Sequence, residues 1–161
     1  KIGGQLWMYT PRTDRKILIA GHLLRQSMMG SDLSYEDQME DHKLSRSYSA
    51  TLEVFEEFEG IHCAILHLLA HDKETTYQTR KVWVNPKNQT VLKEERFAKS
   101  GKLLKRILFK DYDQIAERLF PRTLIFRDML KENTQTTYKF DVIEFDVEIP
   151  EKYFSQSILK R

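Results

Sequence analysis

The residues with the widest range of chemistry lie together in one short segment, 27–37, which reads Ser-Met-Met-Gly-Ser-Asp-Leu-Ser-Tyr-Glu-Asp. Met28 and Met29 are flexible and polarizable, and such side chains suit an apolar surface that adapts to its partner. Gly30 permits a backbone turn, and the serine and aspartate after it can hydrogen-bond neighbouring backbone groups. We therefore expect a tight loop or a one-turn helix. Its methionines either fill the core or form the lip of a binding site.

Residues that often carry catalysis or bind metal are present, but their spacing fits no known site. His67 and His71 lie four residues apart, yet Leu68 stands where the zinc-protease motif has glutamate. Their apolar, strand-like surroundings favour structural histidines. No serine has the flanking glycines of a nucleophile elbow, and the six glycines form no phosphate-binding loop. We therefore expect no enzyme, no metal site and no cofactor.

The composition is that of one globular domain. The chain has 161 residues, of which 40% are hydrophobic and 31% are charged, and this length suits one well-packed domain. A net charge of +2 is too small to indicate a nucleic-acid partner, which needs a concentrated basic stripe. The basic residues of segment 99–110 are typical of a solvated strand face, with contact to lipid headgroups as the alternative. Cys63 is the only cysteine, and its apolar neighbours indicate burial.

Most of the chain shows the two-residue period of β-strands, broken by turn residues such as Asn85-Pro86-Lys87-Asn88. Because the connections are short, consecutive strands should form an antiparallel meander of seven or eight strands. Segment 35–45 is a candidate surface helix, and segment 112–118 is either one helical turn or a wide strand connection. The expected strands are 6–10, 16–20, 52–58, 61–70, 78–84, 91–98 and 102–111.

The apolar pattern changes phase within segment 137–149. Tyr138, Phe140 and Val142 occupy one parity, whereas the apolar residues from Ile143 onward occupy the other. A strand cannot change its buried face without a bulge or a bend. We therefore expect such a feature near residues 142 and 143, in a sheet that curls.

Several segments together resemble the outer-membrane lipoprotein-sorting family, the relatives of the LolA and LolB carriers. The resemblance is carried by Leu-Trp-Met-Tyr-Thr-Pro at 6–11, the basic strand at 15–19, the loop at 26–37, Pro121, and a tail at 145–159 that contains Phe-Asp-Val-Glu-Ile-Pro. It covers nearly the whole chain. It implies a strongly curved antiparallel sheet, an incomplete barrel that shelters acyl chains, in a periplasmic protein.

Members of that family are longer at the amino end, where they carry a signal sequence, an early helix and the first strands. We therefore expect residues 1–161 to be a single LolA-like domain that lacks its amino-terminal cover. A curved sheet without that cover leaves an apolar concave face, which is costly to expose to water. The expected lining of this cavity is Trp7, Tyr9, Leu18 and Phe140, with Met28, Met29 and Leu33 as a mobile lid.

The leading hypothesis is a non-enzymatic periplasmic carrier or binding protein for a lipoprotein or another acylated ligand. The expected partners are acyl chains and a membrane transporter or an outer-membrane receptor, with membrane attachment through a preceding segment as an option. An uncovered face and an unpaired strand edge also favour a homo-oligomer. The alternative is a periplasmic sensor of the same fold that binds a protein partner or peptide through a sheet edge or its apolar face.

Overall fold

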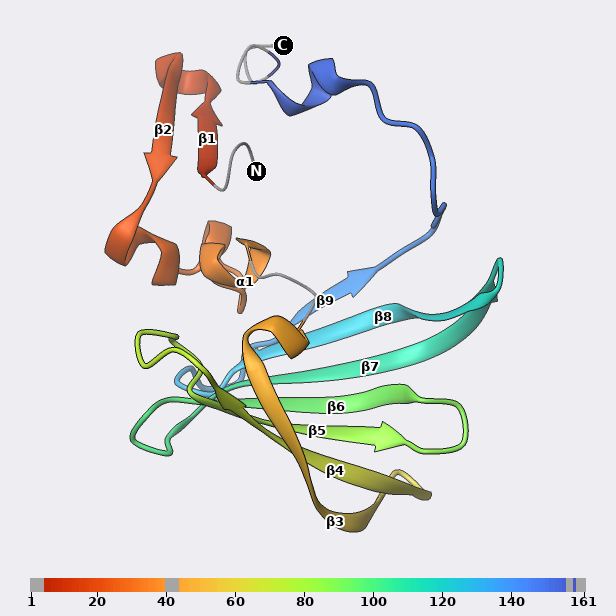
Figure 1. The fold of residues 1–161 in the computed structure, drawn as a ribbon. Coiled ribbons are helices and arrows are strands. Elements are labelled where there is room, and N and C mark those ends of the chain that lie inside the picture. The colour runs from red at the N-terminus through yellow and green to blue at the C-terminus, as the bar shows by residue number, and fades with distance from the viewer. Residues whose placement is uncertain (1–4, 40–43, 156–157, 159–161) are drawn as a thin grey trace. The chain divides into compact units, whose positions relative to one another are not determined.

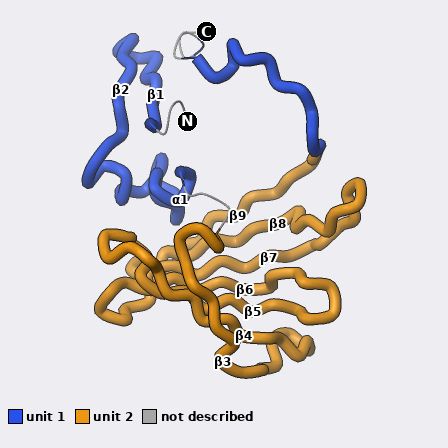
Figure 2. Tube along the Cα trace, viewed as in Figure 1, with its two compact units in different colours: residues 1–41, 144–161 blue, residues 42–143 orange. Residues whose placement is uncertain are grey.

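The computed structural model describes residues 5–39, 44–155 and 158. The chain forms two compact units, and each is described by itself (Figure 2). Unit 1 comprises residues 1–41 and 144–161, and unit 2 comprises residues 42–143. The prediction of one LolA-like domain over residues 1–161 stays a prediction.

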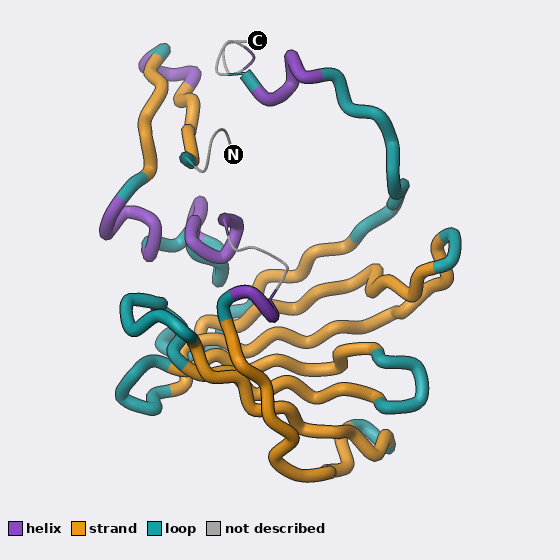
Figure 3. Tube along the Cα trace, viewed as in Figure 1, coloured by secondary structure: helices purple, strands orange, loops and turns teal. Residues whose placement is uncertain are grey.

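Unit 2 is a seven-stranded antiparallel sheet in which each strand pairs with the next strand along the chain (Figures 1 and 3). The predicted meander is therefore confirmed, and helix in this unit is limited to the single turn η4 (Leu44–Arg46) among the described residues. The strands are β3 (Tyr48–Phe58), β4 (Ile61–Ala70), β5 (Thr79–Asn85), β6 (Thr90–Phe97), β7 (Leu103–Ile115), β8 (Arg118–Asp128) and β9 (Thr136–Lys139).

Both faces of this sheet carry buried side chains. Residues directly opposite one another in register point to the same side of a sheet, so the pairing assigns each side chain to a face. The Trp83 face contains Trp83, Lys93 and Arg106, and its buried cluster joins Cys63 and Ile65 to Trp83. The Arg80 face lies on the other side and contains Arg80, Glu94 and Ile107; its buried apolar cluster consists of Tyr48, Leu68 and Val82. Burial on both sides explains why β4 reads as a nearly continuous apolar run.

The edge strand β3 folds over the Trp83 face. This follows from contacts of its side chains with strands beyond its own neighbour β4. Glu53 pairs with Lys81 of β5 at 2.8 Å, and the ammonium of Lys93 in β6 lies 4.9 Å from the Phe58 ring centroid. Figure 1 shows β3 running steeply across the direction of β5 to β8. A break in register between Leu52 and Val54 accompanies the turn of the strand. The predicted strong curvature is confirmed, and in the described residues the sheet stays open between β3 and β9.

A buried ionic network holds the centre of the Arg80 face. Arg80 is 1% exposed, donates to Glu94 at 2.7 Å and to the Tyr48 hydroxyl at 3.0 Å, and lies 4.5 Å from the Tyr48 ring centroid. Arg96 donates to the same carboxylate at 2.9 Å and stacks on Tyr77. A buried guanidinium requires such a partner, since a lone buried charge is costly. The network therefore ties β3, β5 and β6 together.

Unit 1 begins with the hairpin of β1 (Leu6–Thr10) and β2 (Arg15–Ile19), as predicted, joined by the single turn η1 (Pro11–Thr13). Two further 3-10 turns follow, η2 (Gly21–Arg25) and η3 (Met28–Gly30), and then the short helix α1 (Tyr35–Met39). Segment 144–161 contributes the turn η5 (Glu151–Phe154).

The helix α1 begins with a capping box. The Ser34 hydroxyl accepts from the Asp37 N–H at 3.2 Å, and the Asp37 carboxylate accepts from the Ser34 N–H at 2.7 Å. The candidate helix at 35–45 is therefore confirmed over its first residues, Tyr35–Met39. Its predicted residues 40–43 lie outside the described residues, and residues 44–46 form η4.

Three details of the strand pattern differ from expectation. Segment 112–118 is neither a helical turn nor a wide connection, because β7 continues to Ile115 and β8 starts at Arg118. Segment 137–149 is not one strand, since β9 ends at Lys139, although the bend at Asp141 agrees with the feature expected near residues 142 and 143. The basic segment is not a uniformly solvated face: Arg106 contacts Glu95, and the lysines at 105 and 110 pair with Asp128 and Glu59.

Candidate functional site

Three of the predicted site residues share one face of the unit 1 hairpin. Trp7 lies directly opposite Leu18, and Tyr9 follows two residues after Trp7 on the same side. The Tyr9 hydroxyl donates to the Asp14 carboxylate at 3.1 Å, and the Trp7 indole donates to Gln5 at 3.3 Å. Leu18 keeps 37% of its surface exposed. The hairpin therefore presents an aromatic and aliphatic strip with its polar tips satisfied.

The methionine loop is closed by backbone hydrogen bonds. The Met28 N–H donates to the Leu33 carbonyl at 2.8 Å, and the Tyr35 N–H donates to the Gln26 carbonyl at 3.3 Å. Leu33 is 2% exposed and is an anchor of this loop rather than part of its tip. The role of Met28, Met29 and Leu33 as a mobile lid that contacts ligand stays a prediction.

The tip of the loop presents one apolar side chain to solvent. Met29 is 85% exposed and has a left-handed backbone conformation, with φ 50° and ψ 36°. A residue that is not glycine adopts this conformation at some cost. Gly30 follows with φ 78°, which explains why glycine occupies that position.

The seventh predicted residue, Phe140, lies in unit 2 and packs against Phe120, a residue that lines a pocket the sequence did not reveal. Its ring packs edge-on against Phe120, with the centroids 6.1 Å apart. Arg122 holds this part of the chain, since it donates to the Phe140 carbonyl at 3.1 Å and to the Asp113 carboxylate at 2.8 Å. This hydrogen bond lowers the pKa of Asp113.

The pocket has a volume of about 670 Å³ and lies at the end of the sheet where β7 turns into β8. Phe109 and Leu124 face each other across β7 and β8 on the Arg80 face. The apolar lining residues are Val91, Phe109, Tyr112, Leu119, Phe120, Pro121 and Leu124. Polar residues of the β5–β6 turn and of the β7–β8 hairpin complete the wall. A pocket of this size, lined by aromatic side chains with a few polar groups, suits an apolar ligand.

The Tyr112 side chain is held in the wall of this pocket by a hydrogen bond. Its hydroxyl donates to the Val91 carbonyl at 2.6 Å, which links β7 to β6 behind the lining. Burial raises the pKa of Tyr112 to about 12, so the hydroxyl stays protonated at neutral pH. It therefore acts as a fixed donor, while its ring forms part of the apolar wall.

Sequence reasoning missed this pocket because its residues looked like ordinary core. Aromatic residues such as Phe109 recur along the strands, so nothing in the sequence marks Phe109 or Phe120 as part of a pocket. The relevant signal was Pro121 within a strand, since proline is confined to places where the ladder of hydrogen bonds is interrupted. Here β9 pairs with β8 only over residues 123–126, so Pro121 lies beyond that pairing.

His71 and Cys63 have structural surroundings. His71 contacts the Ser49 hydroxyl at 2.9 Å and the Arg46 carbonyl at 3.3 Å. Cys63 is fully buried as predicted, and burial raises the pKa of its thiol. Within residues 5–39, 44–155 and 158, no three histidine, cysteine or acidic side chains are grouped as metal ligands. In the same residues, no helix has the length and apolar character that a membrane span requires.

Comparison with solved structures shows which proteins share this fold. A DUF1329 family protein of Desulfovibrio piger superposes with a TM-score of 0.86 and is 26% identical over 96% of this chain and 64% of its own. A putative outer membrane lipoprotein-sorting protein domain of Vibrio parahaemolyticus gives a TM-score of 0.83 and 25% identity, over 98% of this chain and 66% of its own. The chain thus spans somewhat less than two thirds of these two solved chains.

A LolA superfamily protein of Nitrosomonas europaea gives a TM-score of 0.75 and is 24% identical over 97% of this chain and 68% of its own, which shows the fold alone. No curated protein matches the sequence. The resemblance to lipoprotein-sorting proteins is therefore confirmed at the level of the fold. Because a family model described as "Uncharacterized protein" matches residues 1–161, the chain belongs to that family, and its fold is the one shared by DUF1329, lipoprotein-sorting and LolA superfamily proteins.

Proposed function

We propose that this protein is a non-enzymatic carrier or binding protein of the periplasm, and that its ligand is a lipoprotein or another acylated molecule. The observation that carries the proposal is the aromatic pocket of about 670 Å³ between β6, β7 and β8. An acyl chain placed there gains about 0.8 kcal/mol for each buried CH₂ group. The lipoprotein-sorting name of one fold neighbour supports the same ligand class.

The proposal extends to the partners of a carrier. A carrier must receive and release its cargo, so a membrane transporter or an outer-membrane receptor completes the cycle. The exposed Met29 at the tip of a hydrogen-bonded loop, with Trp7, Tyr9 and Leu18 on the neighbouring hairpin, offers apolar contacts in unit 1. These residues, with Met28, Leu33 and Phe140, form the proposed ligand contacts outside the pocket.

Binding of a fluorescent fatty acid, dansyl-undecanoic acid, to the full chain tests the proposal. Leu119 lines the pocket and is 41% exposed, so Leu119→Glu places a charge at the wall with little cost to folding. The matched control is Leu130→Glu, at a leucine that is 56% exposed and does not line the pocket. We expect the first variant to weaken binding about tenfold, which corresponds to about 1.4 kcal/mol, and the control to bind like wild type. Equal binding by both variants would show that the pocket is not the site.

One observation favours the alternative function, a sensor or interaction module. The edge strand β3 is eleven residues long and exposes Leu52, Val54 and Phe55 by about half of their surface or more. An exposed apolar edge is a template for another strand, from a protein partner or from a second copy. Light scattering on the full chain tests this: a monomer that Phe55→Lys leaves unchanged contradicts self-association, whereas a dimer that Phe55→Lys dissociates supports it.

A further inference from the structure

A second pocket in unit 2 is polar and lies at the opposite end of β8 from the aromatic pocket. Its volume is about 370 Å³, and it is formed by the end of β8 and the loop that leads to β9. Arg127, Lys131 and Gln135 are among its lining residues. The Arg127 guanidinium donates to the Gln135 side-chain oxygen at 3.0 Å, so a neutral group positions it. In the described residues, the structure gives Arg127 no acidic partner.

The one carboxylate in the wall of this pocket is already engaged. Asp128 accepts from the Lys105 ammonium at 2.9 Å and from the Leu130 N–H at 3.0 Å. Lys105 lies directly opposite Asp128 in register, so this pair is a cross-strand ion pair on the Arg80 face. Its charge is compensated and does not neutralise Arg127.

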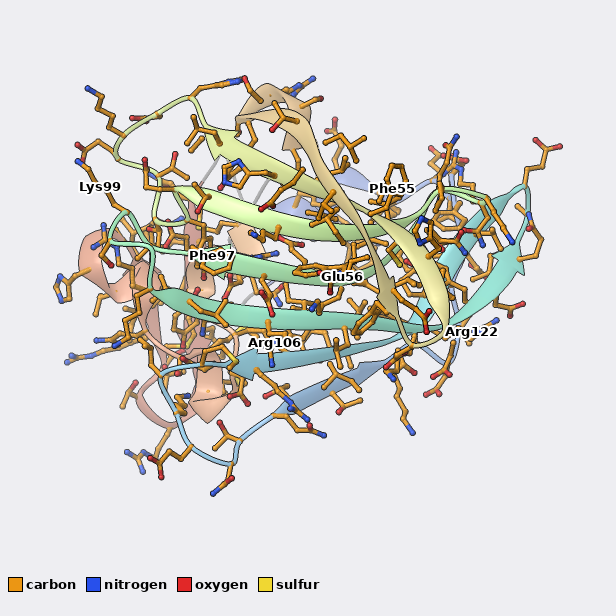
Figure 4. The ribbon with its side chains drawn as sticks, turned by 90° about the horizontal axis from the view of Figure 1, so that it is seen from below. Phe55, Glu56, Phe97, Lys99, Arg106 and Arg122 are labelled. Carbon is orange, nitrogen blue, oxygen red and sulfur yellow. The ribbon has the colours of Figure 1, made fainter. Side chains whose placement is uncertain are left out.

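A second arginine stands directly opposite the first on the Trp83 face. Arg106 of β7 is the register partner of Arg127 of β8 (Arg106 is labelled in Figure 4). Like charges directly opposite across two antiparallel strands destabilise a sheet. Arg106 contacts Glu95 through Nε and Nη2, both at 2.8 Å, which offsets only its own charge.

Glu95 also interacts with a lysine of its own strand. Lys93 lies 3.8 Å from the same carboxylate oxygen, and its ammonium sits 3.4 Å from the Trp83 ring centroid. Burial lowers the pKa of Lys93. Lys81, another cation on this face, is compensated by Glu53. Glu95 thus serves Arg106 and Lys93, and Glu56 also attracts the Lys93 ammonium, so the cation that these carboxylates leave without a partner is Arg127.

From this geometry we propose that the pocket at the β8–β9 loop is an anion site in which Arg127 binds a phosphate or carboxylate group, with Arg106 adding positive charge from the neighbouring strand. A guanidinium group can donate two parallel hydrogen bonds to the oxygens of such a group, and the bound anion supplies the negative charge that Arg127 lacks. The site lies apart from the aromatic pocket, so it stands independently of the acyl-chain proposal. The anion is either free or the headgroup of an amphiphile.

Isothermal titration calorimetry on the full chain at low salt tests this site with three probes, namely inorganic phosphate, dodecyl phosphate and dodecyl maltoside. The test variant is Arg106→Gln/Arg127→Gln, and the matched control is Lys87→Gln/Lys102→Gln, which removes two exposed positive charges from turns. We expect the test variant to lose at least tenfold in affinity for the phosphate probes and the control to keep wild-type affinity. Binding to wild type should weaken as salt is raised.

The probes also identify the source of the anion. Equal affinity for phosphate and dodecyl phosphate supports a free anion, and much tighter binding of dodecyl phosphate, with no binding of dodecyl maltoside, supports a headgroup. Arg127→Gln alone serves if the double variant fails to fold, because Arg127 is exposed. Leu119→Glu should leave phosphate binding unchanged, which separates this site from the acyl pocket. Equal phosphate affinity in wild type, test variant and control would overturn the proposal.

Discussion

The two units of this protein differ in their content of regular structure and in the burial of their apolar side chains. In unit 2 each of seven strands pairs with its neighbour, and buried groups occupy both faces of the sheet. In unit 1 the regular structure is one hairpin and several single turns, and the apolar side chains of Met29, Tyr153 and Phe154 are more than half exposed. Stability should therefore reside mainly in unit 2, whereas unit 1 leaves these apolar side chains exposed.

The sharpest test of this contrast is the buried network of unit 2. Glu94→Gln leaves Arg80 and Arg96 buried without their counter-charge, so we expect the free energy of unfolding to fall by about 3–5 kcal/mol. Glu53→Gln is the control, because the Glu53–Lys81 pair is more than one third exposed on both sides and contributes about 0–1 kcal/mol. Urea denaturation measures both. Equal effects of the two variants would contradict a network that stabilises the sheet.

Apolar truncations compare the two units directly. Ile65 is 1% exposed in the sheet, so Ile65→Ala should lower the free energy of unfolding by about 2–5 kcal/mol. Leu33 is equally buried but belongs to unit 1, so Leu33→Ala should act on that unit alone. Amide hydrogen exchange distinguishes them: Ile65→Ala should speed exchange in β4 and β5, and Leu33→Ala should speed it only in unit 1. Faster exchange of β4 and β5 in Leu33→Ala would show that the units unfold together.

Alkaline pH should weaken unit 2 through Tyr112. Its pKa is about 12 when folded and 10.0 ordinarily, so above about pH 10 the unfolded chain releases a proton that the folded chain keeps. The stabilising contribution of Tyr112 is therefore complete below pH 10 and is lost as pH rises toward 12. Lys93 acts in the opposite sense, because burial lowers its pKa and stability grows as pH rises toward its ordinary value of 10.5.

Comparison with Tyr112→Phe isolates the tyrosine. Absorbance of tyrosinate near 295 nm should show one fewer late-ionising group in the variant, and its unfolding free energy should fall less between about pH 9 and pH 11. Identical titration curves would mean that Tyr112 is not buried against Val91.

The smallest effect on stability should come from the tip of the methionine loop. Met29 is almost fully exposed, so Met28→Ser/Met29→Ser should change the free energy of unfolding by less than about 0.5 kcal/mol. If these side chains contact ligand, the same variant should bind dansyl-undecanoic acid more weakly than wild type. A large loss of stability with unchanged probe binding would instead show that the two methionines are core residues.

Much of the fold was predictable because its information is local. Alternating apolar residues and short turns determine an antiparallel meander, and β4 was predicted over its full observed range, Ile61–Ala70. The end of β9 at Lys139 was not predictable, because the alternating apolar pattern continues beyond it to Val142, past the residues that pair with β8. Tertiary pairing, not periodicity, decides where such a strand stops.

The site was less predictable than the fold. Trp7, Tyr9 and Leu18 do share a face, because hairpin register follows from a short turn. The aromatic pocket depends on Phe109, Tyr112 and Phe120, which are brought together by pairing of β6, β7 and β8. The two opposed arginines were likewise invisible, since Arg106 and Arg127 are 21 residues apart and meet only through register.

The central claim is that the aromatic pocket of unit 2 holds an acyl chain, and native cargo tests it most directly. The full-length protein and its Leu119→Glu and Leu130→Glu variants would be purified from the cell envelope without detergent, and bound lipids measured by mass spectrometry. We predict acyl-bearing molecules in near-equal molar amount with wild type and Leu130→Glu, and strong depletion in Leu119→Glu. Absence of acyl-bearing molecules from wild type, or equal amounts in all three proteins, would contradict the account.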